Sequence, residues 1–586
     1  MNENKNYNVV VGIDFGSSGS GIAYSFMDEN KINLCDIPGA DTDKKVPTEI
    51  ILDDNNYILK FGKGCKQFLK EKGLDKGHYF KDIKMHLYHK KKEIKAQNTN
   101  KTLPLVIVIQ KVLEKLKELS LEQLVKLWNN IDEKKIKWVV TVPAIWGNFE
   151  KSIMLEACEN LGLINKNQDE SLFFALEPEA ASIYCSRNGD IKKDFICDGK
   201  YYIICDLGGG TGDIVTHLVG CNESLEEIVQ SDGGVYGSNE IDKKIFEDLI
   251  YVIFGYKDFY CLQKKAKELD IDEEDTVLFE GWCDLESQIK NFKEEASQDK
   301  IQNKVKYPIC CNVFQDFFNE DILLDDLIKK YNSKCSDNDL ILNVKSRKKW
   351  IIDFPYKIIY NYICEQSKLI CKKIENILNK NKEDIDTIIF VGGYSSNEIL
   401  ISNIKQNLAG KIKTFLYPSK PYLAVMEGAV LFGLNPNIIT IRISKYTIGM
   451  SVNEKWNESK HSKGGKKKFV KEEQSYKCEG CFSKFLEVNQ RLKFGESITH
   501  SYIMTNPRYC TLRFFQSLKP NPTFIYENEV EKMGEFTLDA EEEFPLDERE
   551  IDVCIKFGGT FFDVKAMHKK SQKYINGTLH FNEVNN

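Results

Sequence analysis

The chain repeats one arrangement, a glycine-rich turn between two apolar segments, and this repeat restricts the folds that it can adopt. The first turn is Asp14-Phe-Gly-Ser-Ser-Gly-Ser-Gly21, and the second is Asp206-Leu-Gly-Gly-Gly-Thr-Gly-Asp213. An apolar strand, a glycine-rich turn and a second strand predict a β-hairpin. Because the two hairpins begin about 190 residues apart, they indicate a duplicated lobe rather than a solenoid of short repeats.

The segments around the two hairpins predict alternating helices and strands. Apolar residues recur at helical spacing in 112–128, 149–161 and 356–379, which predicts amphipathic helices. Continuous apolar runs at 138–142 and 387–391 predict buried strands. This alternation favours α/β layers in the part of the chain that contains both hairpins.

The sequence changes character after Asn435-Pro436, where apolar and polar residues begin to alternate. Such alternation predicts half-buried strands, so we expect residues 437–586 to form a separate β-rich domain of roughly sandwich type. Gly558-Gly559 is expected to join two of its strands as a hairpin turn. The lysine-rich segment 455–477 is expected to be a mobile loop.

Charge and hydropathy disfavour several classes of partner. The chain has 81 basic and 88 acidic side chains and a net charge of −7, whereas proteins that bind nucleic acid usually have a strong basic excess. The N-terminal residues lack the pattern of a secretory signal, and no run approaches the ~20 apolar residues that span a bilayer. The 18 cysteines are scattered, which favours free thiols in a reducing compartment. We expect a cytoplasmic monomer that neither spans a membrane nor binds nucleic acid.

The two glycine-rich turns are suited to holding phosphate groups. Without a Cβ atom, backbone N–H groups can converge on phosphate oxygens, and Asp14 and Asp206 are placed to hold Mg²⁺ directly or through water. A third segment, Phe390-Val-Gly-Gly-Tyr394, ends a predicted strand in paired glycines that would let a base or ribose lie against the backbone. Each turn alone could be an ordinary hairpin, but two of the same design favour a nucleotide site.

These motifs together resemble the 70 kDa heat-shock proteins of the actin-like ATPase superfamily. The resemblance covers most of residues 8–436 and is carried by the order and spacing of five motifs. Phe80-Lys-Asp-Ile-Lys-Met-His-Leu87 and Phe432-Gly-Leu-Asn-Pro436 look most like the divergent heat shock 70 kDa protein 12-like branch. The five motifs are Asp14-Phe-Gly-Ser-Ser, Val142-Pro-Ala144, Glu177-Pro-Glu-Ala-Ala181, Asp206-Leu-Gly-Gly-Gly-Thr211 and Val391-Gly-Gly393.

The resemblance implies an α/β fold of the actin-like, ribonuclease-H-like kind. Its ATPase domain would occupy residues 1–436, with one lobe at about 1–200 and 396–436 and the other at about 201–395. The β-rich domain at 437–586 would follow it without a helical lid. A polypeptide client or protein partner is expected to bind this second domain.

The resemblance also implies ATP or ADP and Mg²⁺ as cofactors, and it assigns roles to particular residues. Asp14 and Asp206 would organise the metal, Lys84 would stabilise charge on the γ-phosphate, and Glu177 would position the attacking water. The other residues would contact nucleotide. They are Gly16, Ser17, Ser18, Gly208, Gly209, Gly210 and Thr211 at the phosphates, and Glu286, Lys290, Gly392, Gly393 and Tyr394 at the adenosine.

The chain departs from the family pattern at several positions. Gly19 and Gly212 stand where common members carry an aromatic residue, and Tyr422 stands where an aspartate is usual. The segment 437–444 replaces the family's apolar linker with its aspartates. Lys84 also lies among other lysines, where a solvated side chain is the ordinary expectation.

Three functions follow as hypotheses. The first is a slow ATPase whose nucleotide state modulates binding of a polypeptide, and the second is a nucleotide-gated scaffold with negligible hydrolysis. The third, a small-molecule kinase of the same superfamily, is disfavoured because no base for an acceptor is evident. Cys478-Glu-Gly-Cys481 has metal-ligand spacing, but no second Cys-x-x-Cys or histidine pair accompanies it in the sequence.

Overall fold

The structure is a computed structural model of the 586-residue chain. It describes residues 7–29, 31–40, 44–128, 131–164, 171–187, 191, 198–256, 258–268, 275–318, 323–381, 383–557 and 562–579.

The first hairpin is the centre of a mixed sheet, which we call the lobe I sheet. β1 pairs antiparallel with β2 from Val9↔Phe26 to Asp14↔Gly21, as predicted, and parallel with β10. The strand order is β11-β10-β1-β2-β3, and β4 also pairs with β2. The strands are β1 (Val9–Asp14), β2 (Gly19–Phe26), β3 (Asn33–Leu34), β4 (Val46–Pro47), β10 (Ile136–Val142) and β11 (Leu172–Leu176).

The second hairpin is the centre of a second sheet, the lobe II sheet, with the same local plan. β12 pairs antiparallel with β13 and parallel with β18, just as β1 pairs with β2 and β10. The order is β19-β18-β12-β13-β14-β20-β24. This repetition confirms both predicted hairpins and is consistent with a two-lobed, actin-like fold. The strands are β12 (Tyr201–Leu207), β13 (Gly212–Val219), β14 (Leu225–Gly234), β18 (Thr387–Val391), β19 (Thr414–Leu416), β20 (Ile439–Ile443) and β24 (Arg491–Lys493).

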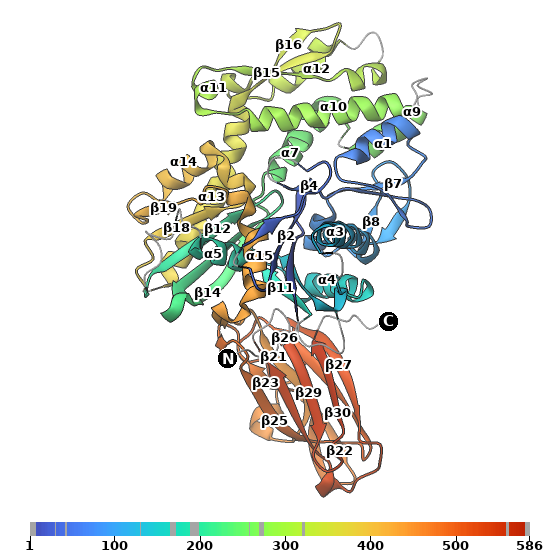
Figure 1. Cartoon of the computed structure of the whole chain (residues 1–586), viewed down its shortest axis with the longest axis vertical. Helices are drawn as coiled ribbons and strands as arrows, with labels where there is room; N and C mark the ends of the chain where they lie inside the picture. The colour runs from blue at the N-terminus through green and yellow to red at the C-terminus, as the bar shows by residue number, and fades with distance from the viewer. Residues whose placement is uncertain are drawn as a thin grey trace.

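Two helices join the sheets at the centre of the molecule (Figure 1). α5 (Glu177–Arg187) and α15 (Ala424–Leu434) share one hydrophobic core with residues of both sheets, including Val10 and Ile204. Their crossing is so close that a Cβ atom added at Gly428 would lie 1.8 Å from the carbonyl oxygen of Ala180. The two sheets therefore share a core that is built around direct backbone-to-backbone packing of these two helices.

The three predicted helices form with shifted ends. The helix predicted at 112–128 begins earlier, as α3 (Leu105–Leu127), directly after Pro104. The helices predicted at 149–161 and 356–379 are α4 (Asn148–Asn160) and α13 (Tyr356–Lys380). Above the lobe II sheet in Figure 1, α10 (Asp275–Glu294) runs close to α1 (Gly64–Lys72), so the two lobes also approach each other there.

The C-terminal part contains two sheets that share one core, as a sandwich does (Figure 1). One has the order β22-β23-β21-β26-β27, and the other has the order β25-β28-β29-β30. Two strands after residue 436, β20 and β24, belong instead to the lobe II sheet. The sandwich strands are β21 (Thr447–Lys455), β22 (Lys466–Val470), β23 (Ser475–Leu486), β25 (Ser497–Ile503), β26 (Tyr509–Ser517), β27 (Val530–Asp539), β28 (Glu550–Lys556), β29 (Phe562–His568) and β30 (Tyr574–Leu579).

The prediction of a mobile loop at 455–477 is wrong. The segment contains a short helix, α16 (Glu458–His461), and the strand β22, which pairs antiparallel with β23. His461 is fully buried at the end of α16. The prediction was based on the lysine content of the segment. The lysines of β22 instead lie on an exposed edge strand, where charged side chains are common. The turn predicted at Gly558-Gly559 lies outside the described residues.

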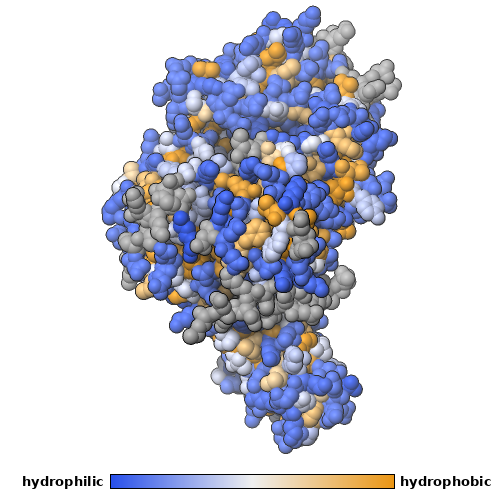
Figure 2. Space-filling view, in the orientation of Figure 1, coloured by the Kyte–Doolittle hydropathy of each residue, from blue (hydrophilic) through white to orange (hydrophobic). Residues whose placement is uncertain are grey.

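The visible surface is predominantly hydrophilic, with scattered hydrophobic residues (Figure 2). Single exposed apolar residues are normal on a globular protein. Among the described residues, no helix is both long enough and apolar enough to cross a bilayer.

Candidate nucleotide site between the lobes

The two glycine-rich turns face each other across the lobe boundary. A Cβ atom added at Gly209 would lie 1.9 Å from Ser18 Oγ, and one at Gly210 would lie 2.6 Å from Ser17 Oγ. Ser18 Oγ donates a hydrogen bond to Asn239 Oδ1 at 3.0 Å, which ties the first turn to lobe II. Side chains at positions 209 and 210 would therefore collide with the serines, so only glycine fits at these two positions.

Backbone hydrogen bonds hold the second turn closed. The N–H of Gly208 donates to the carbonyl oxygen of Thr211 at 3.0 Å, and the N–H of Asn239 donates to the carbonyl oxygen of Gly209 at 2.8 Å. The first turn is equally tight, because a Cβ at Gly16 would lie 2.1 Å from the carbonyl oxygen of Gly19. Both turns thus have fixed shapes before any ligand enters.

Four buried carboxylates gather beneath these turns: Asp14, Glu177, Asp206 and Asp213. Asp206 and Asp213 are paired directly across the β12–β13 hairpin, so their side chains share a face of the sheet. Burial raises the pKa of Asp206 well above its ordinary value, and the charges of Glu177, Asp213 and Asp14 add to this rise. Such a cluster is unfavourable in the ionised state unless cations offset it.

Two lysines supply part of the compensating charge. Lys45 Nζ lies 2.6 Å from Asp14 Oδ2, and Lys84 forms an ion pair with Glu177. The Lys84 side chain is only 3% exposed, so the solvated lysine expected from its neighbours in sequence is not what the structure contains. Burial raises the pKa of Glu177, and the charge of Lys84 opposes that rise. Four carboxylates against two ammonium groups leave an excess of negative charge that suits a divalent cation such as Mg²⁺.

Local structure explains how these side chains meet. Lys84 lies in the first turn of α2 (Ile83–Tyr88), and its Nζ is 5.7 Å from the centre of the Trp146 ring. Glu177 is the first residue of α5, where a carboxylate is favoured by the helix dipole. The structure therefore brings together Asp14, Lys84, Glu177 and Asp206, residues that are distant in sequence.

The third glycine motif lies against the second. β18 is parallel to β12 with Val391 opposite Asp206, and a Cβ at Gly392 would lie 2.5 Å from Asp206 Oδ1. Gly392 also has a φ of +84°, which favours glycine. An added Cβ at Gly393 would meet no atom within 4 Å, so there is free space beside that residue. Tyr394 is buried, and its hydroxyl donates to Gln366 Oε1 at 2.7 Å.

Glu286 and Lys290, both on α10, have different environments. Glu286 accepts hydrogen bonds from Lys66 Nζ at 2.8 Å and Lys81 Nζ at 2.6 Å, which connects α10 to the lobe I side. Burial alone would raise the pKa of Glu286, but these two ammonium groups lower it to about 2. Lys290, one helical turn after Glu286, is 65% exposed and lies 3.7 Å from Glu294.

Comparison with known proteins gives the same family as the motifs. Human heat shock 70 kDa protein 12A is 26% identical to the chain over an alignment of 659 positions, which covers 99% of this chain and 92% of that protein. The mouse protein of that name is 27% identical, with coverages of 99% and 92%. Human heat shock 70 kDa protein 12B is 24% identical, with coverages of 98% and 91%. No protein-family model matches the chain.

The chain is similar over nearly its whole length to proteins named heat shock 70 kDa protein 12A and 12B. The alignments with this branch cover nearly the whole chain, so the similarity includes the sandwich strands as well as the lobes. The resemblance found from the motifs alone extended only over residues 8–436. Alternating strand sequences carry few fixed residues, which explains why the later part of the chain gave no motif.

Three residues at the site were not among the predicted ones. Lys45 pairs with Asp14, Thr141 Oγ1 donates to Asp14 Oδ1 at 3.2 Å, and Asp213 accepts from the N–H of Ile145 at 3.1 Å. Asp213 could have been found, because a hairpin centred on Gly208–Thr211 places it opposite Asp206. Lys45 and Thr141 carry no such signal, since their positions depend on tertiary packing.

Proposed function

We propose that the chain binds ATP or ADP with Mg²⁺ between its lobes and hydrolyses ATP slowly, so that nucleotide state modulates binding of a polypeptide through the sandwich. The observation that carries this proposal is the cluster of four buried carboxylates and two lysines beneath two opposed glycine turns. The similarity to proteins named heat shock 70 kDa protein 12A and 12B supports it.

The residues fit Mg²⁺ and a phosphate chain in distinct roles. Asp14 and Asp206 would hold the cation, which when bound supplies the positive charge that the cluster lacks. Backbone N–H groups of the two turns, together with the hydroxyl of Ser17, would bind phosphate oxygens. Lys84 would offset charge that develops during phosphoryl transfer, and Glu177 would accept a hydrogen bond from the attacking water.

The segment that follows the lobes gives a physical route for coupling. β20 pairs parallel with β14 of lobe II, while Arg442 on β20 forms a two-pronged ion pair with Glu179 of α5, at 2.8 and 2.7 Å. Lys445 Nζ donates to the carbonyl oxygen of Ile145 at 2.6 Å. Relative movement of the lobes would therefore strain this segment.

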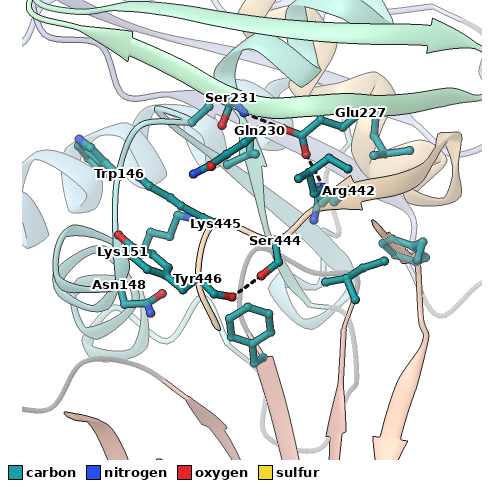
Figure 3. A pocket seen from close by; sticks show the side chains of 17 residues that line it. Trp146, Asn148, Lys151, Glu227, Gln230, Ser231, Arg442, Ser444, Lys445 and Tyr446 are labelled. Atoms are coloured by element: carbon teal, nitrogen blue, oxygen red, sulfur yellow. Dashed lines mark hydrogen bonds between the residues drawn. The ribbon is translucent and has the colours of Figure 1, made fainter. Parts of the chain in front are cut away.

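A cavity of about 100 Å³ lies at this junction (Figure 3). It is lined by residues of α4, β14, the 439–446 segment and the sandwich, such as Lys151, Gln230, Ser444 and Phe562. Because four parts of the chain meet around an incompletely filled space, small displacements between them are physically inexpensive here. We place the coupling between nucleotide and sandwich at this junction.

A nucleotide-gated scaffold with negligible hydrolysis is the second candidate. The observation that favours it is the closed arrangement of the turns, in which Ser18 is held by Asn239 and Lys84 by Glu177. Nucleotide would have to separate these contacts, so binding alone would change the lobe geometry.

Single-turnover hydrolysis of Mg-ATP by the purified chain tests the proposal. We expect phosphate release without any added acceptor, and we expect Asp206→Asn to abolish the Mg²⁺ dependence of ATP binding. Tight binding without phosphate release would establish the scaffold instead. Failure of the wild type to bind ATP with or without Mg²⁺ would refute both candidates.

Replacing Arg442 by methionine, together with Glu179→Gln to avoid a buried unpaired charge, should uncouple the sandwich from nucleotide. We expect Mg-ATP to change amide-hydrogen exchange in 447–579 of the wild type but not of this double variant, while ATP affinity stays within about threefold. Arg491→Met is the matched control, because Arg491 forms an exposed ion pair with Glu226 on the same sheet. An unchanged exchange response in the double variant would exclude the Arg442 route.

A further inference from the structure

Two cysteines and a histidine of the sandwich lie together, away from the nucleotide site. One ligand atom from each of His461, Cys478 and Cys481 lies within 4.8 Å of the others, and all three residues are buried. His461 Nε2 is 3.9 Å from Cys481 Sγ and 3.5 Å from Glu454 Oε2. The sequence had shown only the Cys-x-x-Cys pair, because the histidine comes from a separate segment.

A β-bulge places the two cysteines on one face of their strand. In a regular strand, residues three apart point to opposite faces. Here Cys481 is opposite Val452 and Cys478 is opposite Glu454. The two cysteines are three positions apart on β23, but their partners are only two positions apart on β21, so β23 contains one additional residue. Gly480, with a φ of +70°, absorbs the additional residue. Glu454 and both thiols consequently share one face of the sheet.

The lysine-rich segment folds over this face. α16 carries His461 inward, and the N–H of Gly465 donates to the carbonyl oxygen of His461 at 2.9 Å. A Cβ at Gly465 would lie 3.0 Å from Cys478 Sγ, so the backbone passes directly over the thiol. The cluster is therefore enclosed by its own chain, as structural metal sites commonly are.

We infer that His461, Cys478 and Cys481 form a structural zinc site that fixes the 455–477 segment to β21 and β23. The candidate fourth ligand is Glu454, whose Oε2 lies 3.5 Å from His461 Nε2 and is now paired with Lys460 at 2.6 Å. Zinc bonds of about 2.3 Å to sulfur and about 2.0 Å to nitrogen separate ligand atoms by about 3.5–3.8 Å. The present spacing requires only a small contraction. Thiolate and imidazole ligands select zinc over Mg²⁺ or Ca²⁺.

Metal binding has a defined consequence for His461. Its Nδ1 now accepts a hydrogen bond from the N–H of Asn457 at 3.0 Å, which places the ring proton on Nε2. When zinc binds Nε2, that proton must move to Nδ1, and the thiols of Cys478 and Cys481 lose theirs to solvent. Nδ1 then carries the ring proton, so the Asn457 amide must turn away from it. One hydrogen bond is exchanged for three or four metal–ligand bonds.

Cobalt substitution tests the inference on the full-length, reduced and metal-free chain. We expect one Co²⁺ per chain, with tetrahedral d–d bands and a thiolate-to-cobalt charge-transfer band, all lost when Zn²⁺ is added. C478S/C481S should lack these bands. C510S/C554S is the matched control, since its two thiols also lie on sandwich strands but outside the cluster, and it should retain them.

A second readout does not depend on the variants folding normally. Zn²⁺ should slow tryptic cleavage of wild-type 463–471 by about tenfold or more, because a bound metal lowers the population of the opened segment. An octahedral cobalt spectrum without a thiolate band would overturn the inference. So would equal loss of cobalt in both double variants, or tryptic cleavage that is unaffected by Zn²⁺.

Discussion

Replacing Lys84 by alanine should lower the single-turnover rate of ATP hydrolysis about 100-fold or more, because it removes the one cation that the structure holds against Glu177. The effect should fall on the chemical step. ATP binding should persist, since in the proposed site backbone N–H groups of the two turns would provide most of the phosphate contacts. Parallel measurements of phosphate release and of ATP affinity distinguish an effect on the chemical step from an effect on binding.

Two further variants make this result interpretable. Lys84→Ala leaves the buried Glu177 carboxylate without its partner, which can destabilise the fold by itself. Lys84→Met combined with Glu177→Gln removes both charges and should restore stability without restoring hydrolysis. Lys91→Ala changes an exposed lysine just after α2 and should hydrolyse ATP at the wild-type rate. Turnover by Lys84→Ala at the rate of Lys91→Ala would remove Lys84 from the mechanism.

Replacing Gly428 by alanine should lower the free energy of unfolding by about 3 kcal/mol. Glycine-to-alanine changes inside helices ordinarily stabilise by about 1 kcal/mol, so the expected sign is reversed. The reason is the α5–α15 crossing, where the new Cβ would lie 1.8 Å from the carbonyl oxygen of Ala180. Either the helices separate or the backbone bends, and both disturb the core shared by the lobes.

The matched control is Gly393→Ala, an identical chemical change at a position where an added Cβ meets no atom within 4 Å. It should alter unfolding by less than about 0.5 kcal/mol. Urea denaturation of the two variants beside the wild type gives the comparison. If Gly428→Ala proves as stable as Gly393→Ala, the helices do not cross as closely as described.

The two hairpins, three helices and the acidic residues Asp14 and Asp206 were predictable from local patterns with a physical meaning, whereas Lys84 and Glu177 were assigned through the resemblance to a family. Glycine turns after apolar runs specify their own geometry, and helical periodicity specifies a buried face. The positions of these elements relative to one another came from the resemblance to a family. The role predicted for Lys290, whose side chain is 65% exposed, stays a prediction.

Other features depended on contacts that no local pattern records. The pairing of Lys45 with Asp14 and the folding of 455–477 over two cysteines both join segments that are separate in sequence. The segment after residue 436 has an ordinary strand pattern, which says nothing about which sheet it joins. Register in β23 depends on a bulge at Gly480, and a single glycine in a strand does not reveal one.

The path of the chain between 436 and 493 determines how the molecule can be divided. β20 and β24 complete the edge of the lobe II sheet, but β21, β22 and β23 of the sandwich lie between them in sequence. A truncation after residue 436 would remove β20 and leave β14 as an open edge that is prone to pair with other chains. The two parts are thus interleaved rather than joined end to end, and removing either one at a single cut would damage the other.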